Sequence, residues 1–447
     1  MSAPRSTSIR YVSTRDAAAT AGFGEALERG LAPDGGLYVP TSWPRVQAPE
    51  LLHESSLASL AGRLIGPFVG GEAIEGELPA IAAEAFNFPT PLVALEPQGR
   101  LSVLELFHGP TAAFKDFGAR FLAAAFARLR RADSKPLTIL VATSGDTGGA
   151  VAAAFHGRAG FEVGVLFPKG LVSPTQERQL TCWGDNVRSF AVRGTFDDCQ
   201  RLVKQAFADP ALREQTQLSS ANSINLGRLL PQMVYYAAAS LQIWRDHGER
   251  ASFVIPSGNL GNALACIWAR QIGLPIDRIV LAHNANRTVP DYLHSGEWRP
   301  RASVPTLASA MDVGNPSNME RLRALFPQLE ALRTAIMADS VEDVTIRRRI
   351  RLGFERYGQI WCPHTATAAE VYERLADPAR AAGGLPGRWV VVATAHPAKF
   401  PEIVEPLIGR AVPVPDTLAR LLARPVACTE IAAEPTALRA ALSRRRV

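Results

Sequence analysis

One lysine, Lys115, has the clearest capacity for covalent chemistry in this sequence. Phe114 precedes it and Phe117 follows two positions later. A lysine amine forms a Schiff base with an aldehyde when apolar surroundings lower its pKa by desolvation. The strand-like run 101–107 leads into this turn and the helix-like run 119–130 leads out of it, which is compatible with a sheltered strand-to-helix junction. A solvated lysine near a helix start is the alternative, and spacing alone favours it.

A second turn, residues 143–149, consists of small and hydroxyl-bearing residues and follows the apolar run 136–142. Small residues let a ligand approach the backbone, and hydroxyl and N–H groups at a helix start can hold an anion. Ordinary capping of the helix explains the same pattern equally well. The candidate ligand-binding residues of this turn are Ser144, Gly145, Asp146 and Thr147.

A third turn, residues 256–262, reads Pro-Ser-Gly-Asn-Leu-Gly-Asn and opens a helix-like run. Bare backbone donors, a hydroxyl group and a helix dipole together suit a phosphate group. The turn matches neither the Walker pattern nor a Gly-x-Gly-x-x-Gly dinucleotide fingerprint. An asparagine-capped helix without a ligand is the alternative.

Two further polar residues stand where they could join these turns. Thr394 ends the apolar run 389–393, so its hydroxyl group should lie at the same edge of the sheet, although it could simply cap a turn. Arg228 lies in the amide- and hydroxyl-rich segment 219–232 and offers a fork of donors suited to phosphate or carboxylate. A solvated arginine is the alternative for Arg228.

Apolar, β-rich runs alternate with helix-like stretches from about residue 96 onward, which indicates an α/β fold with parallel sheets covered on both faces. These strand-like runs are residues 101–107, 136–142, 161–167, 187–192, 252–256, 279–282 and 389–394. In such sheets ligands bind beyond the carboxyl ends of the strands, where the turns above lie.

The same pass along the chain predicts three regions. Residues 1–95 form a small, mostly helical N-terminal domain, residues 96–412 form the α/β region, and residues 413–447 form a helical tail. The charged stretch 321–356 is predicted to form surface helices.

Composition excludes several classes of protein. The chain has 447 residues, of which 47% are hydrophobic and 20% charged, as in ordinary globular proteins. The five cysteines are scattered, which argues against a disulfide framework and a structural metal site. The net charge is +6, but residues 439–447 hold four arginines and no acidic residue, so the excess is mostly a solvated end and not a nucleic-acid surface. A polar start and the lack of an 18-residue apolar run predict neither signal peptide nor membrane span.

Taken together, the motifs resemble threonine synthase of the longer bacterial and fungal type. The likeness covers nearly the whole chain and includes the N-terminal pieces 11–15 and 30–40, which have no obvious chemistry of their own. Leu260 departs from it, because the family often has phenylalanine there. The resemblance implies a fold-type II enzyme dependent on pyridoxal 5′-phosphate (PLP), like the β subunit of tryptophan synthase, with residues 140–240 as a smaller, mobile part.

The resemblance also implies roles for individual residues. Lys115 would form the Schiff base with PLP, Thr394 would face the pyridine nitrogen, and the turn at Ser144, Gly145, Asp146 and Thr147 would hold the substrate carboxylate. The candidates for the substrate phosphate are Arg228, His108 and Thr111. The residues implied to bind the cofactor phosphate are Ser257, Gly258, Asn259, Leu260, Gly261 and Asn262.

The implied reaction converts O-phospho-L-homoserine and water to L-threonine and phosphate, in a cytoplasmic monomer or homodimer without metal. Two alternatives stay open at this point. One is a PLP-dependent phospho-lyase acting on substrates like O-phosphothreonine. The other is a non-catalytic protein that binds phosphate or a nucleotide through residues 257–262.

Overall fold

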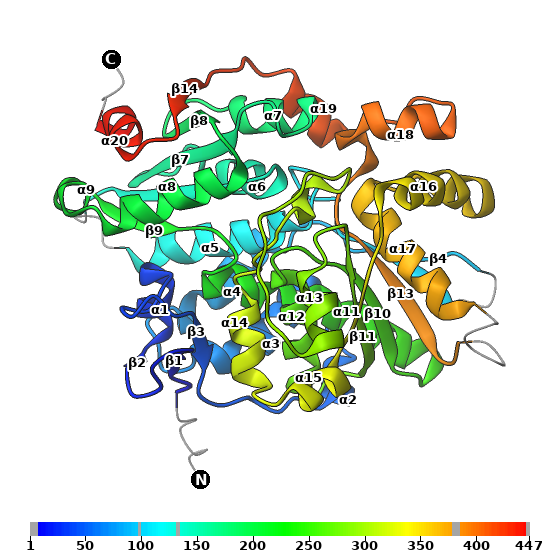
Figure 1. Ribbon diagram of the computed structural model, residues 1–447. Coiled ribbons are helices and arrows are strands. Elements are labelled where there is room, and N and C mark those ends of the chain that lie inside the picture. Colours follow the sequence, from blue (N-terminus) through cyan, green and yellow to red (C-terminus); the bar gives the residue numbers. More distant parts are fainter. Residues whose placement is uncertain (1–7, 97–99, 131–134, 378–384, 444–447) are drawn as a thin grey trace, which may run out of the picture.

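The computed structural model describes residues 8–96, 100–130, 135–377 and 385–443, and contains three sheets. The larger main sheet has the order β12-β11-β10-β13-β5-β4 and is parallel except for β4 at one edge. The smaller main sheet has the order β14-β8-β7-β6-β9 and is wholly parallel. In Figure 1 the elements of the smaller sheet lie at the top, and β10, β11 and β13 lie below them.

The strands have the following bounds. In the larger sheet they are β4 Leu92–Ala94, β5 Leu101–Glu105, β10 Ala251–Pro256, β11 Ile276–His283, β12 Met337–Ser340 and β13 Arg388–Ala393. In the smaller sheet they are β6 Leu137–Ala142, β7 Phe161–Pro168, β8 Val187–Arg193, β9 Gln217–Ser220 and β14 Thr429–Ala432. The third sheet consists of β1 Tyr11–Ser13, β2 Thr20–Ala21 and β3 Tyr38–Pro40.

The α-helices are α1 Phe23–Arg29, α2 Ala48–Leu51, α3 Leu57–Val69, α4 Leu78–Ala85, α5 Lys115–Leu129, α6 Asp146–Phe155, α7 Pro174–Thr181, α8 Phe196–Ala208, α9 Pro210–Gln215, α10 Leu226–Leu229, α11 Met233–His247, α12 Gly261–Gln271, α13 Thr288–Ser295, α14 Met319–Leu325, α15 Leu329–Ala335, α16 Asp343–Tyr357, α17 Pro363–Ala376, α18 Pro401–Ile408, α19 Asp416–Leu422 and α20 Pro435–Ser443. Short 3-10 helices are η1 Glu75–Glu77, η2 Leu230–Gln232, η3 Ser309–Met311 and η4 Pro397–Lys399. No described helix is both long and apolar enough to cross a bilayer.

Both main sheets are covered on two faces, which explains why their central strands β6, β7, β10 and β13 are largely apolar. All six residues of β10 are buried, and successive side chains enter different cores. Phe253 and Ile255 belong to the core shared with α11 and α12, whereas Val254 belongs to the core shared with α16 and α17. The predicted α/β class with parallel sheets is therefore confirmed, and each predicted strand-like run coincides largely with a strand.

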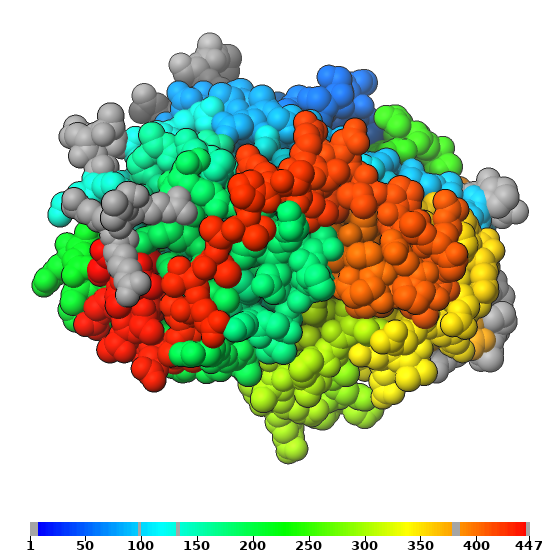
Figure 2. Space-filling model, turned by 90° about the horizontal axis from the view of Figure 1, so that it is seen from above, coloured from blue at the N-terminus to red at the C-terminus, as the bar shows by residue number. Residues whose placement is uncertain are grey.

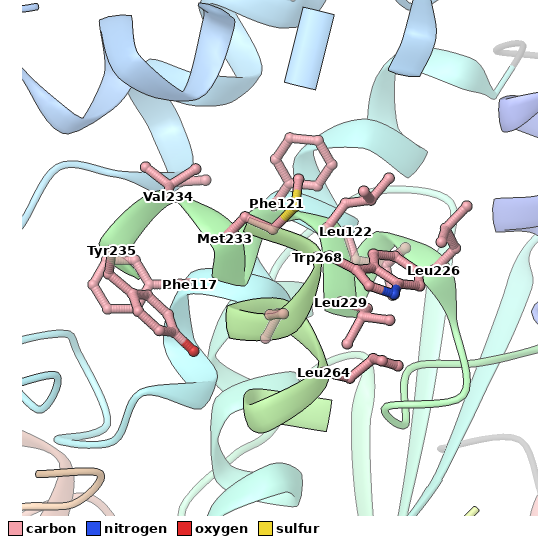
Figure 3. Close-up of a cluster of buried hydrophobic side chains, with 14 of the residues drawn as sticks. Phe117, Phe121, Leu122, Leu226, Leu229, Met233, Val234, Tyr235, Leu264 and Trp268 are labelled. Carbon is pink, nitrogen blue, oxygen red and sulfur yellow. The ribbon is translucent and has the colours of Figure 1, made fainter. Parts of the chain in front are cut away.

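The helical layer beneath the strand ends is tied together by one hydrophobic cluster. Helices α5 and α12 both pack against α10. Figure 3 shows the side chains that meet there, among them Phe117, Phe121, Leu122, Leu226, Leu229, Met233, Val234, Tyr235, Leu264 and Trp268. This packing places the first residues of α5 and α12, Lys115 and Gly261, relative to each other.

Several elements differ from the sequence prediction. The N-terminal region has the predicted helices, but it also contains the small antiparallel sheet β2-β1-β3. Within residues 321–356 the short strand β12 occurs, and Arg321 and Arg349 are buried and not on the surface. The prediction of a purely helical tail is wrong for residues 429–432, because β14 pairs in parallel with β8. Residues 444–447 lie outside the described part of the chain.

The C-terminal segment connects the two main sheets. Helix α18 packs against α16 beside the larger sheet, whereas α19 contacts α7 and α20 contacts α8 beside the smaller one. Figure 2 shows this orange and red segment crossing the upper face of the molecule. The segment therefore belongs structurally to both halves and not to a separate tail.

Candidate active site

Four strand-to-helix turns, at the carboxyl ends of β5, β6, β10 and β13, border one cavity between the two main sheets. The residues predicted from the sequence that line it are Lys115, Ser144, Asp146, Thr147, Arg228, Ser257, Gly258, Asn259, Leu260, Gly261, Asn262 and Thr394. Gly145 lies between two lining residues, and its φ of +139° is a conformation that only glycine adopts readily. Parallel strands thus bring together turns as far apart in the sequence as those of Lys115 and Thr394.

The turn that carries Lys115 is fixed against the turn that carries Thr394. The N–H of Phe114 donates to the carbonyl oxygen of Thr394 at 2.9 Å, and the N–H of His396 donates to the carbonyl oxygen of Ala112 at 3.0 Å. Lys115 is the first residue of α5, and its amine lies 5.8 Å from the centre of the Phe114 ring. These contacts hold the amine at the cavity wall.

Desolvation lowers the pKa of Lys115 to about 8, from an ordinary value of 10.5. The nearby carboxylate of Asp146 opposes this shift, while the cations Arg228 and Lys399 reinforce it. A neutral amine is the form that attacks an aldehyde. Lys115 therefore has the property that the sequence interpretation required.

The pKa of Lys115 leads to a prediction for cofactor capture. In the protein freed of PLP, the rate of Schiff-base formation on adding PLP should rise about tenfold per pH unit up to about pH 8 and then level off, since the neutral fraction of an amine follows that course. Stopped-flow absorbance between pH 6 and 10 measures the profile. A rate that still climbs tenfold per unit between pH 9 and 10 would show an ordinary, solvated lysine.

Two residues proposed for the substrate phosphate lie elsewhere. Thr111 is buried, and both its N–H and its hydroxyl group donate to the Asp116 carboxylate, at 2.8 and 2.7 Å. His108 lies in a neighbouring depression, with its Nε2 2.8 Å from Oε2 of Glu105. In the structure Thr111 therefore shapes the turn before Lys115, and His108 lines the neighbouring depression and not this cavity.

The turn at residues 257–262 is held in an unusual backbone shape close to other chain segments. Leu260 has a φ of +63°, and a Cβ on Gly258 would lie 2.8 Å from the Cα of Met311. Asn259 accepts from the N–H of Ser317 at 2.6 Å and donates to Oγ of Ser223 at 2.8 Å. These hydrogen bonds fix the turn on the side away from the cavity, so the side that faces the cavity is left for a ligand.

Asn262 shows that this inner side suits a phosphate. Its Oδ1 accepts from the hydroxyl groups of Tyr235, at 2.6 Å, and Tyr236, at 2.8 Å, which orients the amide. The amide nitrogen Nδ2 is buried and has no partner among the residues the structure describes. A buried donor without a partner is costly in the free protein, so its presence beside a helix N-terminus fits an anionic ligand. The residues present therefore fit the phosphate of PLP.

This arrangement predicts the effect of Asn262→Asp. The substitution keeps the size of the side chain but replaces the unpartnered donor with a carboxylate, which repels a phosphate dianion. The dissociation constant for PLP should rise about tenfold or more, as measured by absorbance titration of the PLP-free protein. Ser295→Asp, an exposed site on α13, serves as control for the added charge. An unchanged PLP affinity in Asn262→Asp would contradict the placement of the phosphate.

Sequence reasoning missed His364, which lines the cavity. It also missed two buried residues behind the wall, Lys399 and Gln176, which both contact the lining residue Asp146. Lys399 forms an ion pair with Asp146, with Nζ 2.7 Å from Oδ1, and both side chains are buried. Gln176 donates to the same Oδ1 at 3.0 Å. His364, near the start of α17, lines the cavity; its Nε2 accepts from the N–H of Ala310 at 3.1 Å, and desolvation lowers its pKa to about 4, so the ring is neutral. Lys399 stood in the turn with Thr394, but no local signal paired it with Asp146.

Arg321 does not line the cavity but stabilises a segment of its wall through hydrogen bonds. Its guanidinium group donates to the carbonyl oxygens of Tyr38, Ser223 and Ile224, at 2.9, 3.2 and 2.7 Å. It thereby links strand β3 of the N-terminal region to the segment that holds Asn259. Among the described residues no cluster of three histidine, cysteine or acidic side chains suits a metal ion.

Comparison with protein families and known structures identifies the family of this chain. A family model described as "Pyridoxal-phosphate dependent enzyme" matches residues 84–395, and models for the N terminus and the C-terminal part of threonine synthase match residues 10–86 and 365–442. Threonine synthase of Haemophilus influenzae is 42% identical over 94% of this chain and 96% of that protein. Threonine synthase of Escherichia coli is 39% identical over 93% of this chain and 95% of that protein.

Solved structures give the same result. The crystal structure of threonine synthase from Escherichia coli superposes with a TM-score of 0.88 and 36% identity, covering 97% of this chain and 99% of the other. PLP-bound threonine synthase from Brucella melitensis also has a TM-score of 0.88, with 35% identity over 97% and 99% of the two chains. These similarities establish a PLP-dependent lyase with threonine synthase function, which removes the non-catalytic alternative. The chain belongs to the threonine synthase family of fold-type II PLP enzymes.

Proposed function

We propose that this chain converts O-phospho-L-homoserine and water to L-threonine and phosphate, with Lys115 as the residue that holds PLP. One observation carries the proposal. Lys115 begins an α-helix and lines the same cavity as Thr394 and the turn 257–262, which suits a phosphate group. An amine with a pKa near 8, a cradle for a phosphate and a hydroxyl group for a ring nitrogen are the parts that PLP requires.

The cofactor would be held at both ends. The backbone of residues 257–262 and the amide of Asn262 would hold its phosphate, and the hydroxyl group of Thr394 would face its pyridine nitrogen. When bound, PLP supplies an electron sink that acidifies the carbon atoms of an attached amino acid. A hydroxyl partner, unlike a carboxylate, does not hold the ring nitrogen protonated, so the protein dipoles around the ring must share in stabilising charge.

Lys115 would move the protons. Because desolvation lowers the pKa of its amine to about 8, about half of the free amine would be neutral at pH 8, and more of it at higher pH. A neutral amine at the cavity wall can take a proton from the substrate α-carbon and return one later. His364, the next titratable group in the wall, is neutral and held by the N–H of Ala310, so it does not compete as an acid.

The substrate's own charged groups would lie toward α6 and Arg228. Ser144, Thr147 and the first N–H groups of α6 would bind the carboxylate, as helix N-termini do. Arg228 is buried, its Nε has no partner within the described part of the chain, and it lines the cavity, so it remains the candidate for the substrate phosphate. Its N–H donor at Nη1 is already committed to the carbonyl oxygen of Ala221.

The proposal also covers the organisation of the chain and its compartment. Residues 1–95, 96–412 and 413–447 would form the N-terminal domain, the catalytic region and the C-terminal segment, with 140–240 as the mobile part. The enzyme would act in the cytoplasm as a monomer or homodimer. The closeness of α19, β14 and α20 to the smaller sheet supports a C-terminal segment that moves with residues 140–240.

One experiment tests the reaction. The purified PLP-loaded protein is incubated separately with O-phospho-L-homoserine and with O-phosphothreonine, and threonine, 2-oxobutyrate and phosphate are measured in each mixture. Equal amounts of threonine and phosphate are expected from O-phospho-L-homoserine. Formation of 2-oxobutyrate from O-phosphothreonine, without threonine from O-phospho-L-homoserine, would favour the phospho-lyase instead.

A further inference from the structure

Asp146, which lines the cavity, forms a buried ion pair with Lys399 that has no role in the reaction as described so far. Nζ of Lys399 lies 2.7 Å from Oδ1 of Asp146, and their side chains are 0% and 4% exposed. Burying two charges is costly, and apolar residues of similar size often serve stability as well or better. Stability alone is therefore a weak explanation for this pair.

The contacts around the pair join the two main sheets. Asp146 follows β6 and accepts from Nε2 of Gln176 at 3.0 Å, and Gln176 follows β7. Lys399 follows β13, and its Nζ also donates to the carbonyl oxygen of Thr111, in the turn after β5, at 3.0 Å. Oγ of Ser173, at the start of α7, donates to the carbonyl oxygen of Lys399 at 2.9 Å. The pair thus holds the first turn of α6 against the turns of Lys115 and Thr394.

Without a counter-ion, the negative charge of Asp146 would repel the anionic groups of the substrate. Asp146 lines the cavity at the place proposed for the substrate carboxylate. Its own carboxylate is an acceptor only, so it cannot hydrogen-bond a second carboxylate or a phosphate dianion. Burial by itself would raise the pKa of Asp146, but the ammonium group of Lys399, with a smaller contribution from Lys115, holds it well below the ordinary value. The group therefore stays anionic and needs a fixed counter-ion.

We propose that Lys399 is a positioning residue: its ammonium group cancels the charge of Asp146, and it thereby lets the first turn of α6 receive the anionic groups of the substrate. Lys399 touches Asp146 and not the substrate. The inference rests on the proposed function, since that function supplies an amino-acid substrate with a carboxylate and a phosphate.

Three variants separate this role from direct substrate contact: Lys399→Met, Asp146→Asn and the double variant. All are studied as PLP-loaded proteins. Lys399→Met leaves a buried anion unpaired, so KM for O-phospho-L-homoserine should rise at least about 30-fold, with a smaller change in kcat. The double variant removes both charges and should return KM to within about fivefold of the wild type. Asp146→Asn leaves the cation free and should lower the dissociation constant for inorganic phosphate several-fold.

Inorganic phosphate gives a reading that does not depend on the reaction. Its dissociation constant is measured from the absorbance change of bound PLP, and should follow the order Lys399→Met weakest, wild type and double variant similar, Asp146→Asn tightest. If the wild type formed no threonine, the proposed function would fail, yet this order would still support charge cancellation. Should Lys399→Met not fold, Asp146→Asn and the double variant alone test the order.

Two control variants show what would be expected if Lys399 had only a structural role. Arg349→Met breaks a buried ion pair with Glu370, at 2.8 Å between α16 and α17, which does not line the cavity. It should lower the melting temperature without changing KM. Lys169→Met removes an exposed lysine paired with Glu430 and should change neither. The proposal is overturned if Lys399→Met behaves like Arg349→Met, if the double variant keeps the high KM of Lys399→Met, or if phosphate binds all variants equally.

Discussion

Lys115→Ala should reduce threonine formation by at least about 10³-fold, because it removes both the amine that holds PLP and the base that moves the substrate proton. Alanine fits the space without disturbing α5, so the protein should still fold. Two measurements check the prediction: kcat with O-phospho-L-homoserine, and the mass of the protein after treatment with PLP and borohydride. The wild type should gain one reduced PLP adduct on the peptide that contains Lys115, and the variant should gain none there.

The control for this experiment is Lys169→Ala, which removes an exposed lysine that pairs with Glu430 and does not line the cavity. It should retain activity within about twofold, since surface substitutions rarely change function or stability. Lys399 is the other lysine of the cavity region, but its amine is committed to Asp146 and Thr111. Wild-type turnover in Lys115→Ala, or a borohydride adduct that moves to Lys399 with activity intact, would refute the role of Lys115.

Gly258→Ala should weaken PLP binding about 10- to 100-fold. The added Cβ would lie 2.8 Å from the Cα of Met311 and 3.2 Å from the carbonyl oxygen of Ala310. Both atoms belong to the backbone of η3, which cannot turn away as a flexible side chain would. The turn must therefore shift, and the strain typical of overpacked sites is about 1–3 kcal/mol. After this shift the N–H donors of the turn would no longer point toward the phosphate. Absorbance titration of the PLP-free protein with PLP measures the effect.

Gly62→Ala is the matched control for this substitution. Gly62 lies within α3, and nothing stands within 4 Å of the position that its Cβ would occupy. Alanine there should leave PLP affinity unchanged and add up to about 1 kcal/mol of stability, since alanine favours a helix over glycine. Equal PLP affinity in Gly258→Ala and the wild type would show that the turn does not need the close approach to η3.

The contrast between Asp146 and Thr111 shows where sequence reasoning reached its limit. The resemblance to threonine synthase implied a substrate-binding role for both. In the structure the Asp146 side chain pairs with Lys399, and the Thr111 side chain donates to Asp116. A polar turn signals that a ligand or a neighbour must satisfy its groups, but which of the two does so depends on residues far along the chain.

The sequence by itself determined the order of the main strands of the two parallel sheets and the positions of the turns that follow β5, β6, β10 and β13. These signals are local: uninterrupted apolar runs, small residues at strand ends, and a lysine between phenylalanines. The rule that ligands bind at the carboxyl ends of parallel strands then sufficed to bring Lys115, Thr394 and residues 257–262 to one edge. Membership of the family followed from the same local motifs in their order.

Only the tertiary structure decided which side chains share the cavity and which strands complete the sheets. The pairing of Lys399 with Asp146 spans 253 positions, and β14, four residues long, joins β8 from more than 230 positions away. Short edge strands and single buried charges leave almost no pattern in the neighbouring sequence. Their stabilisation comes from contacts with residues that are distant in the sequence and that only the fold brings close. The same holds for His108, which a polar turn suggested for the cavity and which the packing of Phe107 and His396 places outside it.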